Sequence, residues 1–186
     1  MNNLYEELRF NASADALLDQ WMNLRAPGAL CPNKQDFNPM TMGKHLPDVF
    51  MAEFVDNDHV MVRVAGSRTT DVTRRDTTGS NIMDNGGTNN KDTLVHFYTK
   101  MRTGLYAGIS EHHLHNAARP SKVIALQLPL LDADGKANFF VGIIKAERSN
   151  ENSQSIQHNL EKTQTVIHTS FTNLSVHRAP IESKLG

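Results

Sequence analysis

The residues best suited to chemistry lie in one short run, positions 111–115, which reads Glu-His-His-Leu-His. If this run is a β-strand, Glu111, His113 and His115 point to one face, because successive side chains alternate across a strand. Neighbouring imidazoles on one face can bind zinc or another divalent metal. His113 and His115 are therefore candidate metal ligands, and a metal-dependent enzyme is one hypothesis for the chain. The alternative is a polar strand whose histidines face solvent, because such a cluster is not specific without its context.

Other reactive groups are isolated along the chain. Cys31 is the single cysteine, so the chain can form neither an internal disulfide nor a thiolate metal cluster. The turn Thr78-Gly79-Ser80 lacks the lysine and the glycine spacing of a phosphate-binding loop. The strand-turn-helix phrase that presents a nucleophilic serine in hydrolases is also missing. We therefore expect that the protein is not an enzyme.

The composition is that of a soluble protein without a strongly charged surface. The chain has 186 residues, of which 39% are hydrophobic and 21% charged, and its net charge is −1. This length suits one domain with extensions. The even charge balance argues against binding to nucleic acid or to an anionic membrane. The N-terminus lacks the pattern of a secretory signal, and residues 123–131, the longest apolar stretch, are too few to span a bilayer, so we expect a cytoplasmic protein.

Two amphipathic helices are predicted from apolar stripes. The first covers residues 14–25, with Asn11 or Ser13 as its N-cap, and its stripe contains Leu17, Trp21 and Leu24. The second covers residues 91–105 and has a stronger stripe that faces a core. The members of this second stripe are Leu94, Phe97, Tyr98, Met101 and Leu105.

Five strands are predicted around these helices, at 49–55, 59–65, 109–116, 122–131 and 138–146. Sequential antiparallel strands with helices grouped on one side indicate an α+β domain. We divide the chain into an N-terminal flanking helix at 1–26, a domain at 27–148, and a polar linker with a tail at 149–186. Residues 165–174 of the tail have strand-like content, and they could pair with a sheet edge, pack on a partner chain or remain loose.

The segment 66–84 is the most informative part of the chain. It starts where the second strand stops, contains short helical pieces and the turn at Gly79, and ends shortly before the long helix. The flanking phrases are Trp21-Met-Asn-Leu-Arg25, Asp36-Phe-Asn-Pro39, Leu46-Pro47, Val62-Arg-Val-Ala-Gly66 and Thr78-Gly79. In this order, over residues 12–147, the chain resembles the PAS family. It is most similar to single-domain bacterial PAS proteins (PAS fold type 5, common in alphaproteobacteria).

This resemblance implies a five-stranded antiparallel sheet with helices over one face and a pocket between them. The expected pocket residues are Leu94, Phe97, Tyr98 and Met101. If the side chain of Arg63 faces inward, its guanidinium would anchor a carboxylate ligand, and the alternative is an exposed arginine on the sheet. The cofactor is unknown, because the chain has no haem, flavin or nucleotide signature. In particular, His96 lies on the helix face opposite the core stripe, and Cys31 stands outside the cysteine phrase of flavin photoreceptors.

The resemblance also implies sensing, ligand binding or protein association, usually without catalysis. We therefore expect a stand-alone PAS sensor or adaptor that binds a small ligand or a signalling protein partner. The ligand would favour one packing of the helices and so alter a partner surface. A homodimer is expected through the N-terminal helix, at Trp21. The alternatives are the metal-dependent enzyme on the His113 and His115 face and an interaction module without a ligand.

Overall fold

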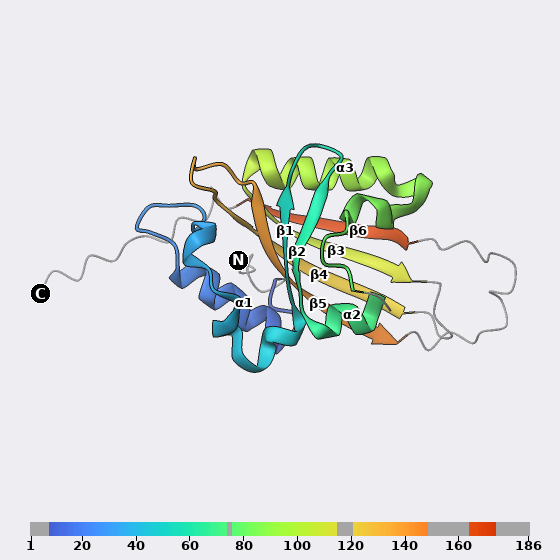
Figure 1. Cartoon of the computed structure of the whole chain (residues 1–186), viewed down its shortest axis with the longest axis horizontal. Helices are drawn as coiled ribbons and strands as arrows, with labels where there is room; N and C mark the ends of the chain where they lie inside the picture. Colours follow the sequence, from blue (N-terminus) through green and yellow to red (C-terminus); the bar gives the residue numbers. More distant parts are fainter. Residues whose placement is uncertain (1–7, 74–75, 115–120, 149–163, 174–186) are drawn as a thin grey trace, which may run out of the picture.

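The computed structural model describes residues 8–73, 76–114, 121–148 and 164–173. In these residues, six strands form one antiparallel sheet in the order β2-β1-β5-β4-β3-β6 (Figure 1). The strands are β1 (Val49–Phe54), β2 (Val60–Ala65), β3 (Tyr106–Leu114), β4 (Ser121–Leu130), β5 (Phe139–Arg148) and β6 (Gln164–Asn173). The first five confirm the predicted five-stranded sheet and its α+β class.

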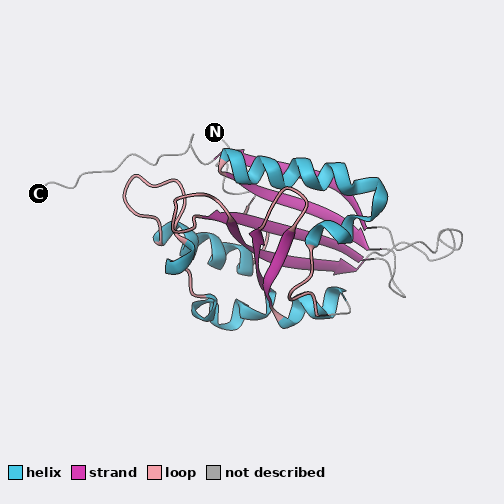
Figure 2. Ribbon diagram, turned by 45° about the horizontal axis from the view of Figure 1, so that its top comes forward, coloured by secondary structure: helices cyan, strands magenta, loops and turns pink. Residues whose placement is uncertain are grey.

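Helices cover both faces of this sheet (Figure 2). The α-helices are α1 (Ala12–Asn23), α2 (Ser67–Thr73) and α3 (Gly87–Gly104). The 3-10 helices are η1 (Lys34–Asp36), η2 (Pro39–Asp48) and η3 (Ile82–Gly86). α2, η3 and α3 lie over one face, as predicted, and α1 packs on the other. No helix of the described residues is long and apolar enough to cross a lipid bilayer.

The N-terminal helix α1 starts at Ala12, two residues before the predicted start at residue 14. Asn11 is its N-cap, since the side-chain oxygen accepts a hydrogen bond from the Ala14 amide at 2.8 Å. Ser13, the other predicted cap, lies inside the first turn and is buried. Its hydroxyl donates to the carboxylate of Asp48 at 2.7 Å.

The apolar stripe of α1 is buried within the chain. Leu17, Leu18 and Trp21 have no exposed surface, and the Trp21 indole N–H donates to the Pro129 carbonyl at 2.8 Å. Their partners on the sheet are Leu126, Leu128, Leu130, Val141 and Ile143. Trp21 itself is therefore not available for a dimer contact, because its whole indole is buried within the chain. A homodimer through the N-terminal helix remains a prediction.

The sheet separates two apolar cores, because alternate residues of a strand face opposite sides. On β4, Leu126, Leu128 and Leu130 face α1, whereas Val123 and Ala125 face α3. The second core also holds four of the five residues of the predicted stripe of α3, since Leu94, Phe97, Tyr98 and Met101 are all buried there. The fifth, Leu105, follows the end of the helix and packs against the first core. The Tyr98 ring stacks on Phe140 with centroids 5.6 Å apart.

The tail pairs with the sheet edge, which is one of the three predicted outcomes. β6 runs antiparallel to β3, from Tyr106 opposite Asn173 to Leu114 opposite Gln164. Without β6, β3 would be an open edge that presents unpaired backbone groups. The sheet therefore has one strand more than the resemblance implied.

A buried carboxylate, Asp48, joins three elements where η2 meets β1. One of its oxygens accepts the hydrogen bond from Ser13 of α1, and the Arg68 guanidinium of α2 lies 2.7 Å from the other. The His45 ring nitrogen Nδ1 lies 2.9 Å from the Ser13 hydroxyl. A charged group in a buried position needs such partners, so this network connects α1, η2 and α2.

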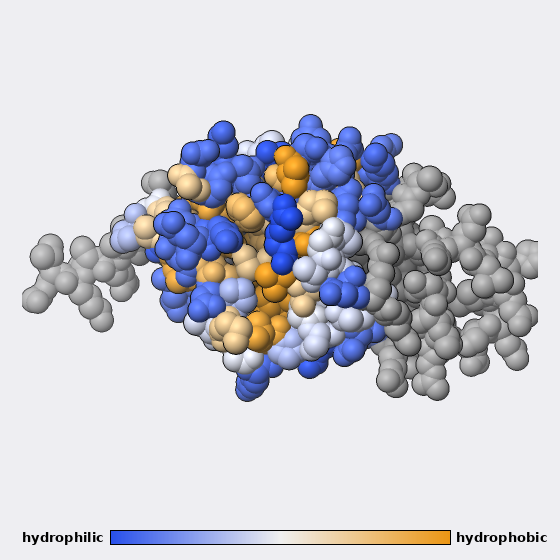
Figure 3. Space-filling view, viewed as in Figure 1, coloured by the Kyte–Doolittle hydropathy of each residue, from blue (hydrophilic) through white to orange (hydrophobic). Residues whose placement is uncertain are grey.

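Exposed apolar side chains gather on the surface beside β2. Met40 is 70% exposed and Val64 36% exposed, and both line a shallow groove with Leu46 and Pro47. Figure 3 shows hydrophobic residues in this lower middle part of the view, with hydrophilic residues around them.

Candidate functional site

A cavity of about 110 Å³ lies between the sheet and the helices α2, η3 and α3. Four strands and all three helical elements contribute to its wall. The lining residues are Phe50, Val62, Thr69, Val72, Thr73, Thr77, Ile82, Leu94, Tyr98, Val123, Ala125, Gln127 and Ile144. The wall is mostly apolar, so the cavity favours a ligand with an apolar body.

The segment that follows β2 builds one side of the cavity. At Gly66 the chain passes so close to the 46–47 backbone that a β-carbon would contact the Pro47 carbonyl oxygen and lie 2.7 Å from the Leu46 oxygen. α2 follows, and a turn at Gly79, with φ of 78°, brings the chain back beside β2. There the Gly79 amide donates to the Val62 carbonyl at 2.8 Å, and the Val62 amide donates to the Ser80 carbonyl at 2.9 Å. The segment thus forms a cavity wall and also covers the outer edge of β2.

Three polar atoms of the cavity wall have no hydrogen-bond partner among the residues that the structure describes. They are the hydroxyl oxygens of Thr69 and Thr77 and the amide oxygen of Gln127. All three side chains are buried, with exposed fractions of 8%, 4% and 1%. Buried polar groups are normally paired, so each unpaired one calls for an explanation such as a bound molecule.

The Gln127 amide is held by its nitrogen. Nε2 donates to the Ser110 hydroxyl at 3.0 Å. Burial raises the pKa of the Tyr98 hydroxyl above its ordinary value, and a hydrogen bond with the Gln127 side chain opposes this rise. The amide oxygen of Gln127 has no hydrogen-bond partner among the described residues.

The size of the cavity restricts what can enter it. Its volume is below the roughly 150 Å³ of a protein cavity that holds benzene, and below the roughly 300 Å³ at which drug-sized pockets start. A water molecule or a ligand of about five or six heavy atoms fits in this volume.

Two of the four predicted helix residues line this cavity. Leu94 and Tyr98 are in its wall. Phe97 and Met101 are equally buried, but they pack over β3, where a β-carbon on Gly108 would lie 2.6 Å from the Phe97 ring and 3.0 Å from the Met101 sulfur. The stripe predicted the buried face of α3 correctly, but it could not separate the cavity wall from the solid core.

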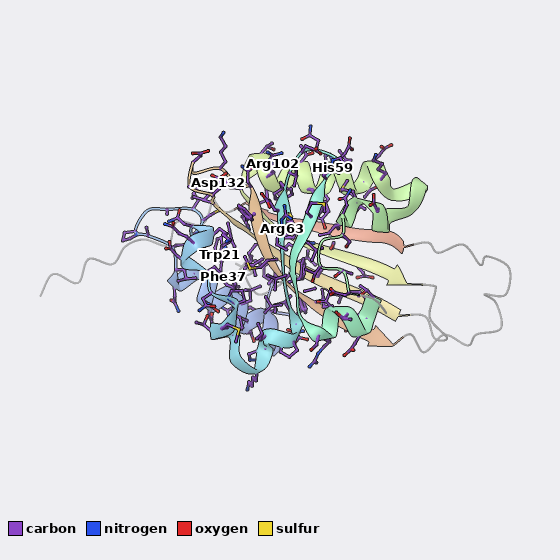
Figure 4. The ribbon with its side chains drawn as sticks, viewed as in Figure 1. Trp21, Phe37, His59, Arg63, Arg102 and Asp132 are labelled. Carbon is purple, nitrogen blue, oxygen red and sulfur yellow. The ribbon has the colours of Figure 1, made fainter. Side chains whose placement is uncertain are left out.

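Arg63 lies outside the cavity, which corrects the inward alternative. Its side chain is 48% exposed, and its Nε is 2.7 Å from the Glu53 carboxylate on β1. Val62 is the β2 residue that lines the cavity, and Arg63, next along the strand, takes the opposite side (Figure 4). Arg63 is therefore not the expected carboxylate anchor, and the polar residues of the described wall include Thr69, Thr77 and Gln127.

The predicted metal ligands fall largely outside the described residues. The backbone of His113 belongs to β3 and pairs with Lys122, but its side chain and all of His115 lie outside the description. Within the described part of the chain, no three His, Cys, Asp or Glu side chains come close enough to hold a metal ion. His96 is exposed on α3, on the side away from the core, as its position in the sequence predicted.

Cys31 is buried, with 2% of its surface exposed. Burial raises the pKa of its thiol to about 12, although the nearby Arg25 charge opposes the rise. At pH 8 the folded protein keeps the neutral thiol, whereas the unfolded chain, with a pKa of roughly 8.5, supplies reactive thiolate. Raising the pH above about 8.5 therefore favours the unfolded chain.

We expect Ellman's reagent at pH 8 to label native Cys31 at least about 100-fold more slowly than the same chain in guanidinium chloride. The measurement is the absorbance of the released thiolate with time. Complete labelling within seconds in the native state would contradict the buried position of Cys31.

One comparison with known protein families bears on this fold. The family model of a PAS domain matches residues 9–145. Among solved structures, that of a point variant of RsLOV matches with 12% sequence identity and a TM-score of 0.40, over 59% of this chain and 64% of that chain. The match thus spans less than two thirds of that protein, and so distant a likeness says nothing of what this chain binds. No curated protein matches the chain.

Proposed function

Because this chain belongs to the PAS domain family, we propose that it is a sensory module, without catalytic activity, that binds a small molecule in the cavity between its sheet and helices. The observation that carries this proposal is the apolar cavity between the sheet and α2, η3 and α3, whose wall holds three unpaired buried polar atoms. A binding site needs such a combination of apolar area and a few placed polar groups.

The sensory step follows from the position of the cavity. Its wall includes Thr69 and Val72 of α2, and Leu94 and Tyr98 of α3, so a ligand would contact both helices at once. Binding would favour the arrangement of these helices that closes on the ligand, by a shift in population. The outer sides of the helices carry exposed residues, among them Arg68 on α2, and a signalling partner would read the change there.

The substitution Ala125→Leu tests the use of the cavity, because Ala125 lines it and is 5% exposed. A leucine would fill much of the space, so we expect stability to change by no more than about 1 kcal/mol. The wild-type protein should melt about 3–6 °C higher with a small neutral fragment, such as furan, at roughly ten times its dissociation constant. The variant should lose this rise in thermal unfolding scans.

The matched control is Ala146→Leu, the same change at an exposed position of β5. This variant should respond to the fragment as the wild type does. If Ala125→Leu also keeps the full response, the fragment binds elsewhere and the proposed site is wrong.

A further inference from the structure

We infer that the cavity selects a small uncharged molecule with a hydrogen-bond donor, and that the Gln127 amide oxygen is the acceptor; this rests on the proposed function of the cavity. The starting observation is that this oxygen is buried and has no partner in the described part of the chain. An amide oxygen accepts hydrogen bonds and cannot donate them. Whatever satisfies it must therefore bring an N–H or O–H group.

The surroundings of Gln127 keep this oxygen directed at the cavity. Its register neighbours on the two adjacent strands are both glycines, Gly108 on β3 and Gly142 on β5. Since neither has a side chain, aromatic rings occupy the space, with Phe97 over Gly108 and Phe50 over Gly142. The amide thus lies between two apolar rings, and its nitrogen is fixed by Ser110.

The rest of the described wall disfavours a charged ligand. None of the described residues that line the cavity is Asp, Glu, His, Lys or Arg. A charged group that is buried without an opposite charge or several hydrogen bonds loses more hydration free energy than its contacts with an apolar wall can recover. The hydroxyls of Thr69 and Thr77, on the wall opposite the sheet, can each donate or accept a further hydrogen bond.

These limits define one class of ligand. It has about five or six heavy atoms, from the volume of the cavity, and an apolar body with one N–H or O–H group. A small alcohol, a small amide or an N–H heteroaromatic ring belongs to this class. A carboxylate does not, in contrast to the ligand that an inward Arg63 would have bound.

Pyrrole and furan are the probes that test this inference, because the two rings are nearly identical in shape and only pyrrole has an N–H donor. Dissociation constants are measured by NMR titration for wild-type protein, Gln127→Met and the exposed control Gln35→Met, with acetate as the charged probe. We expect wild type and Gln35→Met to bind pyrrole about tenfold more tightly than furan, which corresponds to one good hydrogen bond. Gln127→Met should bind both about equally, and acetate should not bind.

The other outcomes distinguish a failure of the donor requirement at Gln127 from a failure of small-molecule binding in the cavity. If wild-type protein binds furan as tightly as pyrrole, the cavity still binds small molecules but the donor requirement is wrong. If Gln127→Met keeps the preference for pyrrole, Gln127 is not the acceptor. Tighter binding of acetate overturns the neutral class. If no probe binds, the proposed function fails together with the inference.

Discussion

Replacing Trp21 with alanine is expected to lower the free energy of unfolding by about 3–5 kcal/mol. The indole has no exposed surface and fills the space between α1 and the β4 and β5 strands. Its loss leaves a large void and also removes the hydrogen bond to the Pro129 carbonyl. Denaturant titration followed by circular dichroism measures the change.

Two controls separate the contributions at this position. Trp21→Phe keeps an aromatic ring but leaves the Pro129 carbonyl without its hydrogen bond. The unpaired carbonyl alone should lower the free energy of unfolding by about 1–2 kcal/mol, in addition to the cost of the smaller ring. Asn23→Ala, at an exposed position of the same helix, should change stability by less than about 0.5 kcal/mol. A loss at Trp21→Ala no larger than that of Asn23→Ala would mean that α1 does not pack on the sheet.

The second large effect is expected at Gly66, where alanine should cost about 3 kcal/mol. The added methyl group would contact the Pro47 carbonyl oxygen and lie 2.7 Å from the Leu46 oxygen. These neighbours are backbone atoms, which cannot move aside as the end of a side chain can. Moving them would disturb Asp48 and the start of β1, and Gly66 itself donates to the Val49 carbonyl at 2.8 Å.

The matched control for Gly66→Ala is Ser67→Ala, one residue later at an exposed position. This change adds no atom and should alter the unfolding free energy by less than about 0.5 kcal/mol. Equal stabilities of the two variants in denaturant titration would show that the chain at residue 66 does not approach the 46–47 backbone closely.

The helices could be predicted where apolar residues recur with a clear helical spacing. The stripe of Leu17, Trp21 and Leu24 has helical spacing over about two turns and the stripe on α3 over about three, and both helices form. β6 could not be assigned, because its polar and apolar residues hardly alternate. Its place depends on the edge that β3 offers, a property of the assembled sheet.

The cavity residues were harder to predict, for two physical reasons. Arg63 lies in a strand with apolar residues on both faces, and the register of β2 against β1 shifts between Met51 and Ala52, so alternation alone could not choose its side. Gln127 was missed although it interrupts the apolar stretch of residues 123–131, which is a usable signal. Its role depends on Gly108 and Gly142, which only strand pairing brings beside it.

The central claim is that small molecules bind between the sheet and α2, η3 and α3, and methyl NMR tests it most directly. On titration with pyrrole, we expect shifts in the methyl signals of the cavity wall, at Val62, Val72, Leu94 and Ile144. The methyl signals of the core under α1, at Leu17, Leu128 and Val141, should stay in place. Unchanged cavity signals at saturating pyrrole, or equal shifts in both cores, would contradict the claim.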